Sequence, residues 1–142
     1  MPRWAKICLW ATGGVALVIA AGVWSFGALT SDMCGNEQLL ELPSSDGELK
    51  VVVFQRDCGA TTGFSTQVSI VSAAESLPNR SGNLFVADTD HGRVPAGVGG
   101  GPEVRVAWVG ARSLRIAHYR EARVFLANAA MAGISAEYVT FP

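Results

Sequence analysis

The hydrophobic pattern divides the chain into one continuous apolar segment and a longer region in which apolar and polar residues alternate. Residues 7–29 form a run of 23 residues that contains no charged side chain. As an α-helix this run would be about 34 Å long, enough to cross a hydrocarbon core of about 30 Å. The pattern therefore predicts one transmembrane helix over residues 7–30.

The charges beside the apolar run predict its orientation. Arg3 and Lys6 precede the run, and acidic residues follow it. Because basic flanks stay in the cytoplasm, we expect residues 1–6 inside the cell and residues 31–142 outside as one domain. A cleaved secretory signal is the alternative, but its apolar core is normally about 7–15 residues long. The length favours an uncleaved anchor, with the lipid bilayer as its partner through residues 7–30.

Beyond the apolar run the hydrophobic period is close to two. Val104, Val106 and Trp108 fall on one face of an extended segment, and Glu103 and Arg105 fall on the other. This alternation predicts strands with one buried face. The expected strands cover residues 39–42, 49–56, 67–71, 103–108, 113–116, 122–126 and 134–141.

Short turn sequences separate these segments. Residues 43–47 read Pro-Ser-Ser-Asp-Gly, residues 110–112 read Gly-Ala-Arg, and a weaker turn signal lies at 132–133. Such short connections favour antiparallel pairing, because parallel strands need long crossovers. The sequence predicts a mainly β fold: a small antiparallel sandwich or curled sheet of about seven strands, preceded by the transmembrane helix. The expected core consists of Val51, Val53, Val68, Ile70, Phe85, Val104, Val106, Trp108, Leu114, Ile116, Val124 and Tyr138.

The three cysteines differ in their surroundings. Cys8 lies in the apolar segment, whereas Cys34 and Cys58 lie in the region expected outside the cell. Two cysteines in an oxidising compartment usually pair, and closing a loop of about 25 residues would contribute roughly 3.5 kcal/mol. Two alternatives remain for Cys58: it could be a free structural thiol, or a reactive thiol beside His91 or His118.

The residues around Cys58 are polar and small. Turn chemistry before the next strand is the favoured interpretation, because Gly59 and Gly63 permit positive φ angles. The alternative is a recognition loop on a rigid scaffold. Its candidate residues are Arg56, Asp57, Thr61, Thr62 and Ser65.

A second chemically suggestive segment reads Asp-Thr-Asp-His-Gly at 88–92. Asp88, Asp90 and His91 are weak candidates for binding a divalent cation. The late bidentate glutamate of a calcium loop is missing, so a plain turn after a strand is favoured. We expect no metal and no cofactor.

Two further composition features argue against nucleotide or nucleic-acid binding. The glycine-rich residues 94–102 precede an expected strand, whereas a phosphate-binding loop follows a strand and opens a helix. The formal net charge is −1, and five arginines at positions 105–123 are interspersed with acidic residues, as on a solvated sheet face. We therefore expect no nucleic-acid partner.

Three segments carry a resemblance to a known family. They are MCGNE at 33–37, SSDGELKVVVFQRDCGATTGFSTQVSI at 44–70 and NLFVAD at 83–88. Together they resemble an uncharacterised family of small bacterial envelope proteins, membrane-anchored or lipoproteins, with a CGATTGFSTQ-like motif. The resemblance covers roughly residues 33–126. It implies a bacterial, extracytoplasmic domain with a Cys34–Cys58 disulfide, and it carries no activity.

These observations favour a non-catalytic protein of the bacterial cytoplasmic membrane whose periplasmic or extracellular β domain binds or organises an envelope protein or polymer. One alternative is a metal-dependent or thiol hydrolase that uses Asp88, Asp90 and His91, with Cys58 as a further candidate. The other is an immunity or accessory protein directed against an envelope toxin. The sequence predicts no catalytic residue.

Overall fold

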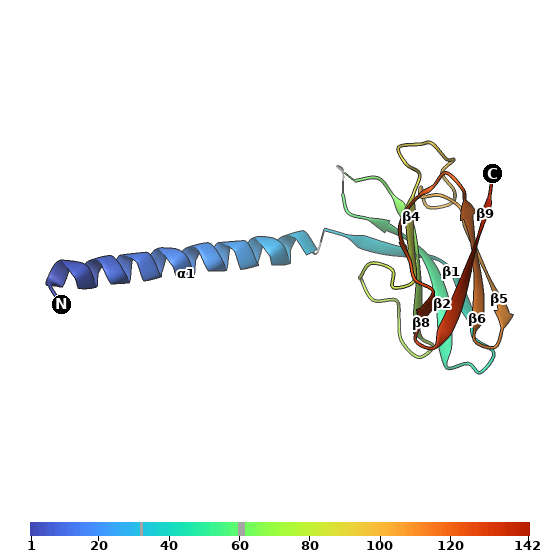
Figure 1. Ribbon diagram of the computed structural model, residues 1–142, viewed down its shortest axis with the longest axis horizontal. Coiled ribbons are helices and arrows are strands. Elements are labelled where there is room, and N and C mark those ends of the chain that lie inside the picture. The colour runs from blue at the N-terminus through green and yellow to red at the C-terminus, as the bar shows by residue number, and fades with distance from the viewer. Residues whose placement is uncertain (32, 60–61) are drawn as a thin grey trace. The chain divides into compact units, whose positions relative to one another are not determined.

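The structure is a computed structural model that describes residues 1–31, 33–59 and 62–142, with side chains for 1–26, 33–59 and 62–142. Within these ranges the chain forms one helix and nine strands (Figure 1). It divides into two compact units, Met1–Met33 and Cys34–Pro142. The first unit contains the helix and the second contains all the strands.

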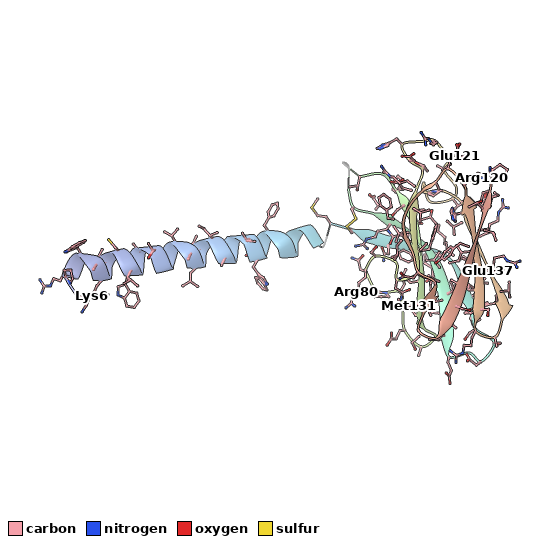
Figure 2. The ribbon with its side chains drawn as sticks, in the orientation of Figure 1. Lys6, Arg80, Arg120, Glu121, Met131 and Glu137 are labelled. Atoms are coloured by element: carbon pink, nitrogen blue, oxygen red, sulfur yellow. A yellow bond between two sulfur atoms is a disulfide. The ribbon has the colours of Figure 1, made fainter. Side chains whose placement is uncertain are left out.

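Helix α1 spans Arg3–Ser31 and is apolar on all of its described sides. Within it, Arg3–Phe26 is a stretch of 24 residues with a mean hydropathy of 2.0 and no buried residue. Its side chains project around the whole helix (Figure 2). At 1.5 Å per residue the stretch is about 36 Å long, so this helix is long and apolar enough to span a bilayer.

The nine strands form two sheets, and the expected mainly β fold is confirmed. The five-stranded sheet has the order β1 (Gly35–Pro43), β2 (Leu49–Asp57), β3 (Ser65–Ser72), β4 (Phe85–Asp88) and β7 (Arg123–Ala127). The four-stranded sheet has the order β5 (Val104–Gly110), β6 (Ser113–Tyr119), β9 (Ile134–Phe141) and β8 (Ala130–Met131). The predicted hairpin turns at 43–47, 110–112 and 132–133 join β1 to β2, β5 to β6 and β8 to β9.

One pairing differs from the antiparallel expectation. Strands β6 and β9 are parallel, whereas the other strand pairs of the described chain are antiparallel. The chain leaves β6, adds β7 to the five-stranded sheet, and returns through β8 before it forms β9. This excursion supplies the long crossover that a parallel pair needs.

The hydrophobic core lies between the two sheets. Its buried cluster includes seven of the predicted core residues, Val51, Val53, Val68, Ile70, Phe85, Leu114 and Ile116, together with Leu84, Ala87 and Ile134. Four other predicted core residues, Val104, Val106, Trp108 and Tyr138, pack partly buried against this cluster. The prediction for Val124 is wrong: its side chain is 38% exposed because β7 is an edge strand.

The outer face of the five-stranded sheet is also covered in part. Val52 and Phe54 lie on the face opposite Val51 and Val53, yet both are completely buried. Residues 73–84, which connect β3 to β4, lie on this face: Asn36 Nδ2 donates to the carbonyl oxygens of Pro78 and Arg80. This connection therefore forms one wall of the outer face.

Candidate binding site

A row of polar side chains crosses the outer face of the five-stranded sheet. Register pairs Asn36 with Arg56, Arg56 with Ser65, Ser65 with Asp88, and Asp88 with Arg123. Residues that are directly paired across neighbouring strands point to the same face of a sheet. The row therefore joins positions that are up to 87 residues apart in the sequence, from Asn36 on β1 to Arg123 on β7.

A pocket of about 470 Å³ opens over this row. Its lining includes four residues of the row, Arg56, Ser65, Asp88 and Arg123, and the neighbouring Gln67, Val86 and Phe125. Its remaining lining residues are Cys58, Thr62, Gly63, Ser81 and His91. The pocket thus brings together the polar segment after Cys58 and the acidic turn after β4, which the sequence treats as separate candidates.

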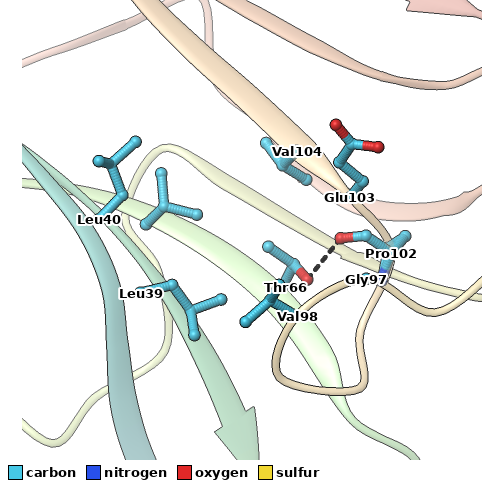
Figure 3. Close-up of a pocket in the computed structure, with 9 residues that line it drawn as sticks. Leu39, Leu40, Thr66, Gly97, Val98, Pro102, Glu103 and Val104 are labelled. Atoms are coloured by element: carbon cyan, nitrogen blue, oxygen red, sulfur yellow. Dashed lines mark hydrogen bonds between the residues drawn. The ribbon is translucent and has the colours of Figure 1, made fainter.

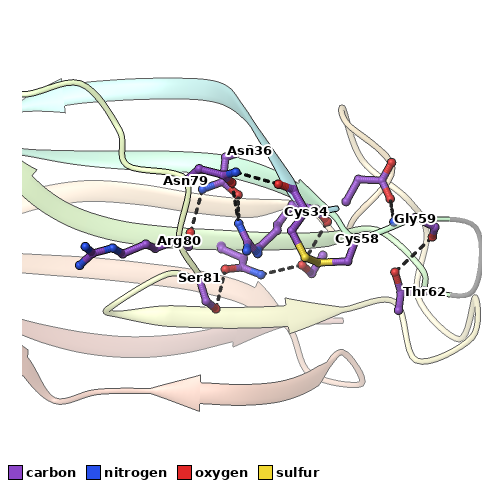
Figure 4. Close-up of a disulfide and its surroundings, with 12 residues drawn as sticks. Cys34, Asn36, Cys58, Gly59, Thr62, Asn79, Arg80 and Ser81 are labelled. Atoms are coloured by element: carbon purple, nitrogen blue, oxygen red, sulfur yellow. Dashed lines mark hydrogen bonds between the residues drawn. A yellow bond between two sulfur atoms is a disulfide. The ribbon is translucent and has the colours of Figure 1, made fainter. Parts of the chain in front are cut away.

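The disulfide fixes one side of this pocket. The sulfur atoms of Cys34 and Cys58 lie at disulfide distance, 2.08 Å apart (Figure 4). The pair links the residue before β1 to the residue after β2, and Asn79 Nδ2 donates to the Cys34 carbonyl oxygen over 2.8 Å. The disulfide therefore holds Cys58 to the start of β1, and the hydrogen bond from Asn79 holds Cys34 to the 73–84 connection.

Arg56 enters the pocket from β2 in a fixed orientation. Its Nη1 donates to Asn36 Oδ1 over 2.7 Å and to Asn79 Oδ1 over 3.1 Å. Both acceptors are neutral amides, and no carboxylate of the described residues lies within ion-pair distance of its guanidinium. Arg56 is therefore a partly buried positive charge without a counter-charge in the described chain.

Arg123 is engaged by its neighbours at the other end of the row. Its Nε and Nη2 donate to the two carboxylate oxygens of Asp88, and its Nη1 lies 3.3 Å from His91 Nε2. Because an arginine only donates, His91 Nε2 acts as the acceptor here. Burial raises the pKa of Asp88, but the hydrogen bonds from Arg123 and the Asp90 amide outweigh it and place this pKa below 3.8.

The weak metal candidates form a turn around this ion pair. Asp88 Oδ1 accepts the Asp90 amide, and Asp90 and His91 both have positive φ angles, 50° and 58°. The guanidinium of Arg123 occupies the space between Asp88 and His91 that a cation would need. Within the described residues, no group of three or more cysteine, histidine or acidic side chains is arranged to hold a metal ion.

Three of the five candidate recognition residues line this pocket. Arg56, Thr62 and Ser65 line the pocket, whereas Asp57 accepts the Gly59 amide and is absent from the lining. Thr61 lies outside the described residues. Among the pocket residues that sequence reasoning missed, Gln67 accepts hydrogen bonds from Ser81 Oγ and the Gly82 amide. In the alternating segment 67–71, Gln67 falls on the face opposite to that of Val68. This alternation was the only sequence signal that the Gln67 side chain points away from the core.

A second, more apolar pocket of about 320 Å³ lies beside β1 (Figure 3). It is lined by Leu39, Leu40, Val53, Thr66, Gly97, Val98, Pro102, Glu103 and Val104. The Thr66 hydroxyl donates to the Pro102 carbonyl oxygen over 2.7 Å, so its polar group is already satisfied. The glycine-rich residues 94–102 therefore pack against β3 as a turn and close this side of the sandwich.

No family model matches the chain, no curated protein matches it, and no solved structure matches it.

Proposed function

We propose that this protein is a single-pass membrane protein whose β domain lies outside the cytoplasm and binds an envelope partner. The observation that carries the proposal is the 24-residue apolar stretch Arg3–Phe26, none of which is buried within the structure. Exposing so much apolar surface to water is unfavourable, at roughly 25 cal/mol per Å². A bilayer removes this surface from water without any further protein contact.

Two further features support the orientation. Arg3 and Lys6 lie at the N-terminal end of the apolar stretch, where the positive-inside rule places the cytoplasm. The disulfide between Cys34 and Cys58 belongs to an oxidising compartment such as the bacterial periplasm. Both features are consistent with a β domain on the far side of the cytoplasmic membrane.

The binding role is supported by the pocket over the outer face of the five-stranded sheet. Its lining combines a charged row, hydrogen-bonding side chains and the exposed ring of Phe125, as ligand sites commonly do. A thiol hydrolase would need Cys58 as a thiolate, but Cys58 is paired with Cys34. A metal hydrolase would need Asp88 and His91, which contact Arg123 instead. The geometry favours recognition over catalysis.

Cysteine labelling in intact cells tests the topology. A cysteine placed at Val98, which is 86% exposed, should react with a membrane-impermeant maleimide in cells that express the full chain. A cysteine placed at Pro2, in the segment expected inside the cell, should react only after the membrane is permeabilised, and it serves as the control. Labelling of the Val98→Cys variant only in lysed cells would refute the proposed orientation.

Photo-crosslinking tests the binding role. A photo-crosslinking residue at Phe125 should capture an envelope component from intact cells, whereas the same residue at Val109, on the outer face of the other sheet, should not. Capture that is equal at both positions, or absent at both, would count against the pocket as the binding surface.

A further inference from the structure

We infer that the pocket over the outer face of the five-stranded sheet binds the C-terminal carboxylate of a peptide, with Arg56 as the group that receives it. The inference deepens the proposed binding function and rests on it for the existence of a partner. Its own basis is the charge, the orientation and the apolar surface of the pocket residues.

The charge of the pocket is unbalanced by one unit. Two guanidinium groups, of Arg56 and Arg123, and one carboxylate, of Asp88, line it. Asp88 and Arg123 neutralise each other through two hydrogen bonds, which leaves the positive charge of Arg56. A single carboxylate restores the balance, whereas a phosphate monoester carries about −1.5 to −2 charges at neutral pH.

The guanidinium of Arg56 is oriented before any ligand arrives. Asn36 and Asn79 hold Nη1, and Asn36 is itself fixed by donating to the Pro78 and Arg80 carbonyl oxygens. Nη1 is the one nitrogen of this guanidinium with a hydrogen-bond partner among the described residues. Nε and Nη2 thus keep their N–H groups for a carboxylate, which an arginine edge can bind through two parallel hydrogen bonds.

The far end of the pocket provides an apolar surface. The Phe125 side chain is 60% exposed, and the Arg123 guanidinium lies over its ring at 5.1 Å from the centroid. Arg56 and Phe125 belong to strands β2 and β7, three strand spacings or about 14 Å apart. An extended peptide of about three or four residues spans this distance at roughly 3.3–3.6 Å per residue. Its terminal carboxylate would face Arg56 while an apolar side chain contacts Phe125.

A polyuronic acid from a surface polymer is the competing carboxylate source. Each of its sugar units carries a carboxylate, so it would bring several negative charges to a pocket that lacks only one. It also has no apolar side chain for Phe125. The peptide terminus fits both features.

Calorimetric titration of the full-length protein in phosphatidylcholine nanodiscs tests the inference. The probes are the tripeptide N-acetyl-phenylalanyl-alanyl-alanine with a free carboxylate, the same tripeptide as its C-terminal amide, and trigalacturonate. We expect saturable binding of the free tripeptide, weakened by added salt, and at least about tenfold weaker binding of the amide, as for the loss of a charged hydrogen bond.

Variants assign the binding to the pocket. Arg56→Gln should weaken tripeptide binding by about tenfold or more, and Arg115→Gln, on the other sheet, should leave it unchanged. Because Arg56 also supports the 73–84 connection, Ser65→Asp is the second variant. It places a carboxylate in the middle of the row, where Gln67 Nε2 can still donate to it, as it now does to Ser65 Oγ over 2.8 Å. We expect this variant to stay folded and to lose binding.

Four results would overturn the inference. These are equal binding of the acid and the amide, an unchanged affinity of both variants, preferential binding of trigalacturonate, and no saturable binding of any probe. None of these results bears on the membrane topology, which cysteine labelling measures, or on partner capture at Phe125. The proposed function and the assignment to a peptide terminus can therefore fail separately.

Discussion

Asp88 is the residue whose charge organises one end of the polar row. Its side chain is 17% exposed, and its pKa lies below 3.8 because the hydrogen bonds from Arg123 and the Asp90 amide outweigh the effect of burial. A carboxylate whose pKa is lowered in the folded state contributes stability above its unfolded pKa and loses that contribution as the pH falls.

Asp88→Asn should therefore destabilise the β domain at pH 7 by about 1 kcal/mol, a low value because solvent screens the pair. The difference between wild type and variant should begin to shrink as the pH falls through 3.8, the value for an unfolded aspartate, and should disappear below the lower pKa of the folded state. Urea unfolding at a series of pH values measures it. Glu103→Gln is the control, because Glu103 pairs with Arg105 on an exposed surface, and a drop as large as that of Asp88→Asn would contradict the argument.

A second prediction for a single residue concerns the buried hydroxyl of Tyr138. Its hydroxyl lies 2.7 Å from the Asn128 carbonyl oxygen and 3.1 Å from that of Leu84, and burial raises its pKa to about 12. The unfolded tyrosine ionises near pH 10 while the folded one stays protonated, so stability should fall between pH 10 and pH 12.

Tyr138→Phe should lack this alkaline loss and should be less stable at pH 7 by about 1–2 kcal/mol, because the Asn128 carbonyl loses its donor. Guanidinium unfolding followed at pH 7, 10 and 11.5 compares the two proteins. An identical pH dependence of both would show that Tyr138 is not the responsible group.

The disulfide is the element that joins the beginning of the β domain to the end of β2. Cys34 and Cys58 are separated by 24 residues, and the chain-entropy model assigns a loop of this length roughly 3.5 kcal/mol. The Cys34→Ser/Cys58→Ser double variant should lose about this much free energy of unfolding. Cys8→Ser is the matched control, and equal stability of the two variants in urea unfolding would contradict the prediction.

The 73–84 connection depends on one close backbone approach. A Cβ atom at Gly82 would lie 2.8 Å from the Phe85 carbonyl oxygen and 2.9 Å from that of Val68. Gly82→Ala should therefore displace the connection and destabilise the domain by about 1–3 kcal/mol, as overpacking does. At Gly35 a Cβ atom would meet nothing within 4 Å, so Gly35→Ala should be nearly neutral. Thermal unfolding compares the two variants, and equal midpoints would contradict this account.

The sequence predicted the hairpin turns and seven of the nine described strands, but it missed the short strands β4 and β8 and did not predict how the strands pair into sheets. The alternation of apolar and polar residues is a local property of the sequence. It therefore locates β5 through Val104 and Val106, and β6 through Leu114. The parallel pairing of β6 with β9 depends on where β7 joins, which no local pattern records. The continuous apolar run at 51–54 is a local signal that β2 is buried on both faces, but no local pattern records that the 73–84 connection lies on the outer face.

The candidate site shows the same limit. The polar segment around Arg56 and the acidic turn at Asp88 were both recognised, but as unrelated features. They share one pocket because of the register of four strands. Arg123 lies opposite Asp88 in this register, so the acidic turn forms an ion pair with Arg123. Side-chain chemistry could be predicted from the sequence, whereas the neighbours that neutralise it could not.

At the scale of the whole molecule, the two units depend on different surroundings. The β domain buries its own core and needs no partner to do so, whereas α1 leaves Ile7, Val15 and Val18 at least 60% exposed. Removing this apolar surface from water is favourable, so we expect a membrane to hold the first unit and to decide where the second unit works.

Two arginines in α1 test this dependence. Arginine near the centre of a membrane helix costs about 2.5–3.5 kcal/mol on insertion scales, so Val15→Arg together with Val18→Arg should shift the full chain from the membrane fraction to the soluble or degraded fraction. Carbonate extraction of membranes followed by immunoblotting measures the shift. Val98→Arg makes the same chemical change on the surface of the β domain and should leave the protein in the membrane. If the double variant stays with membranes as completely as Val98→Arg does, α1 is not the anchor, and the exposed apolar helix must be buried against another protein.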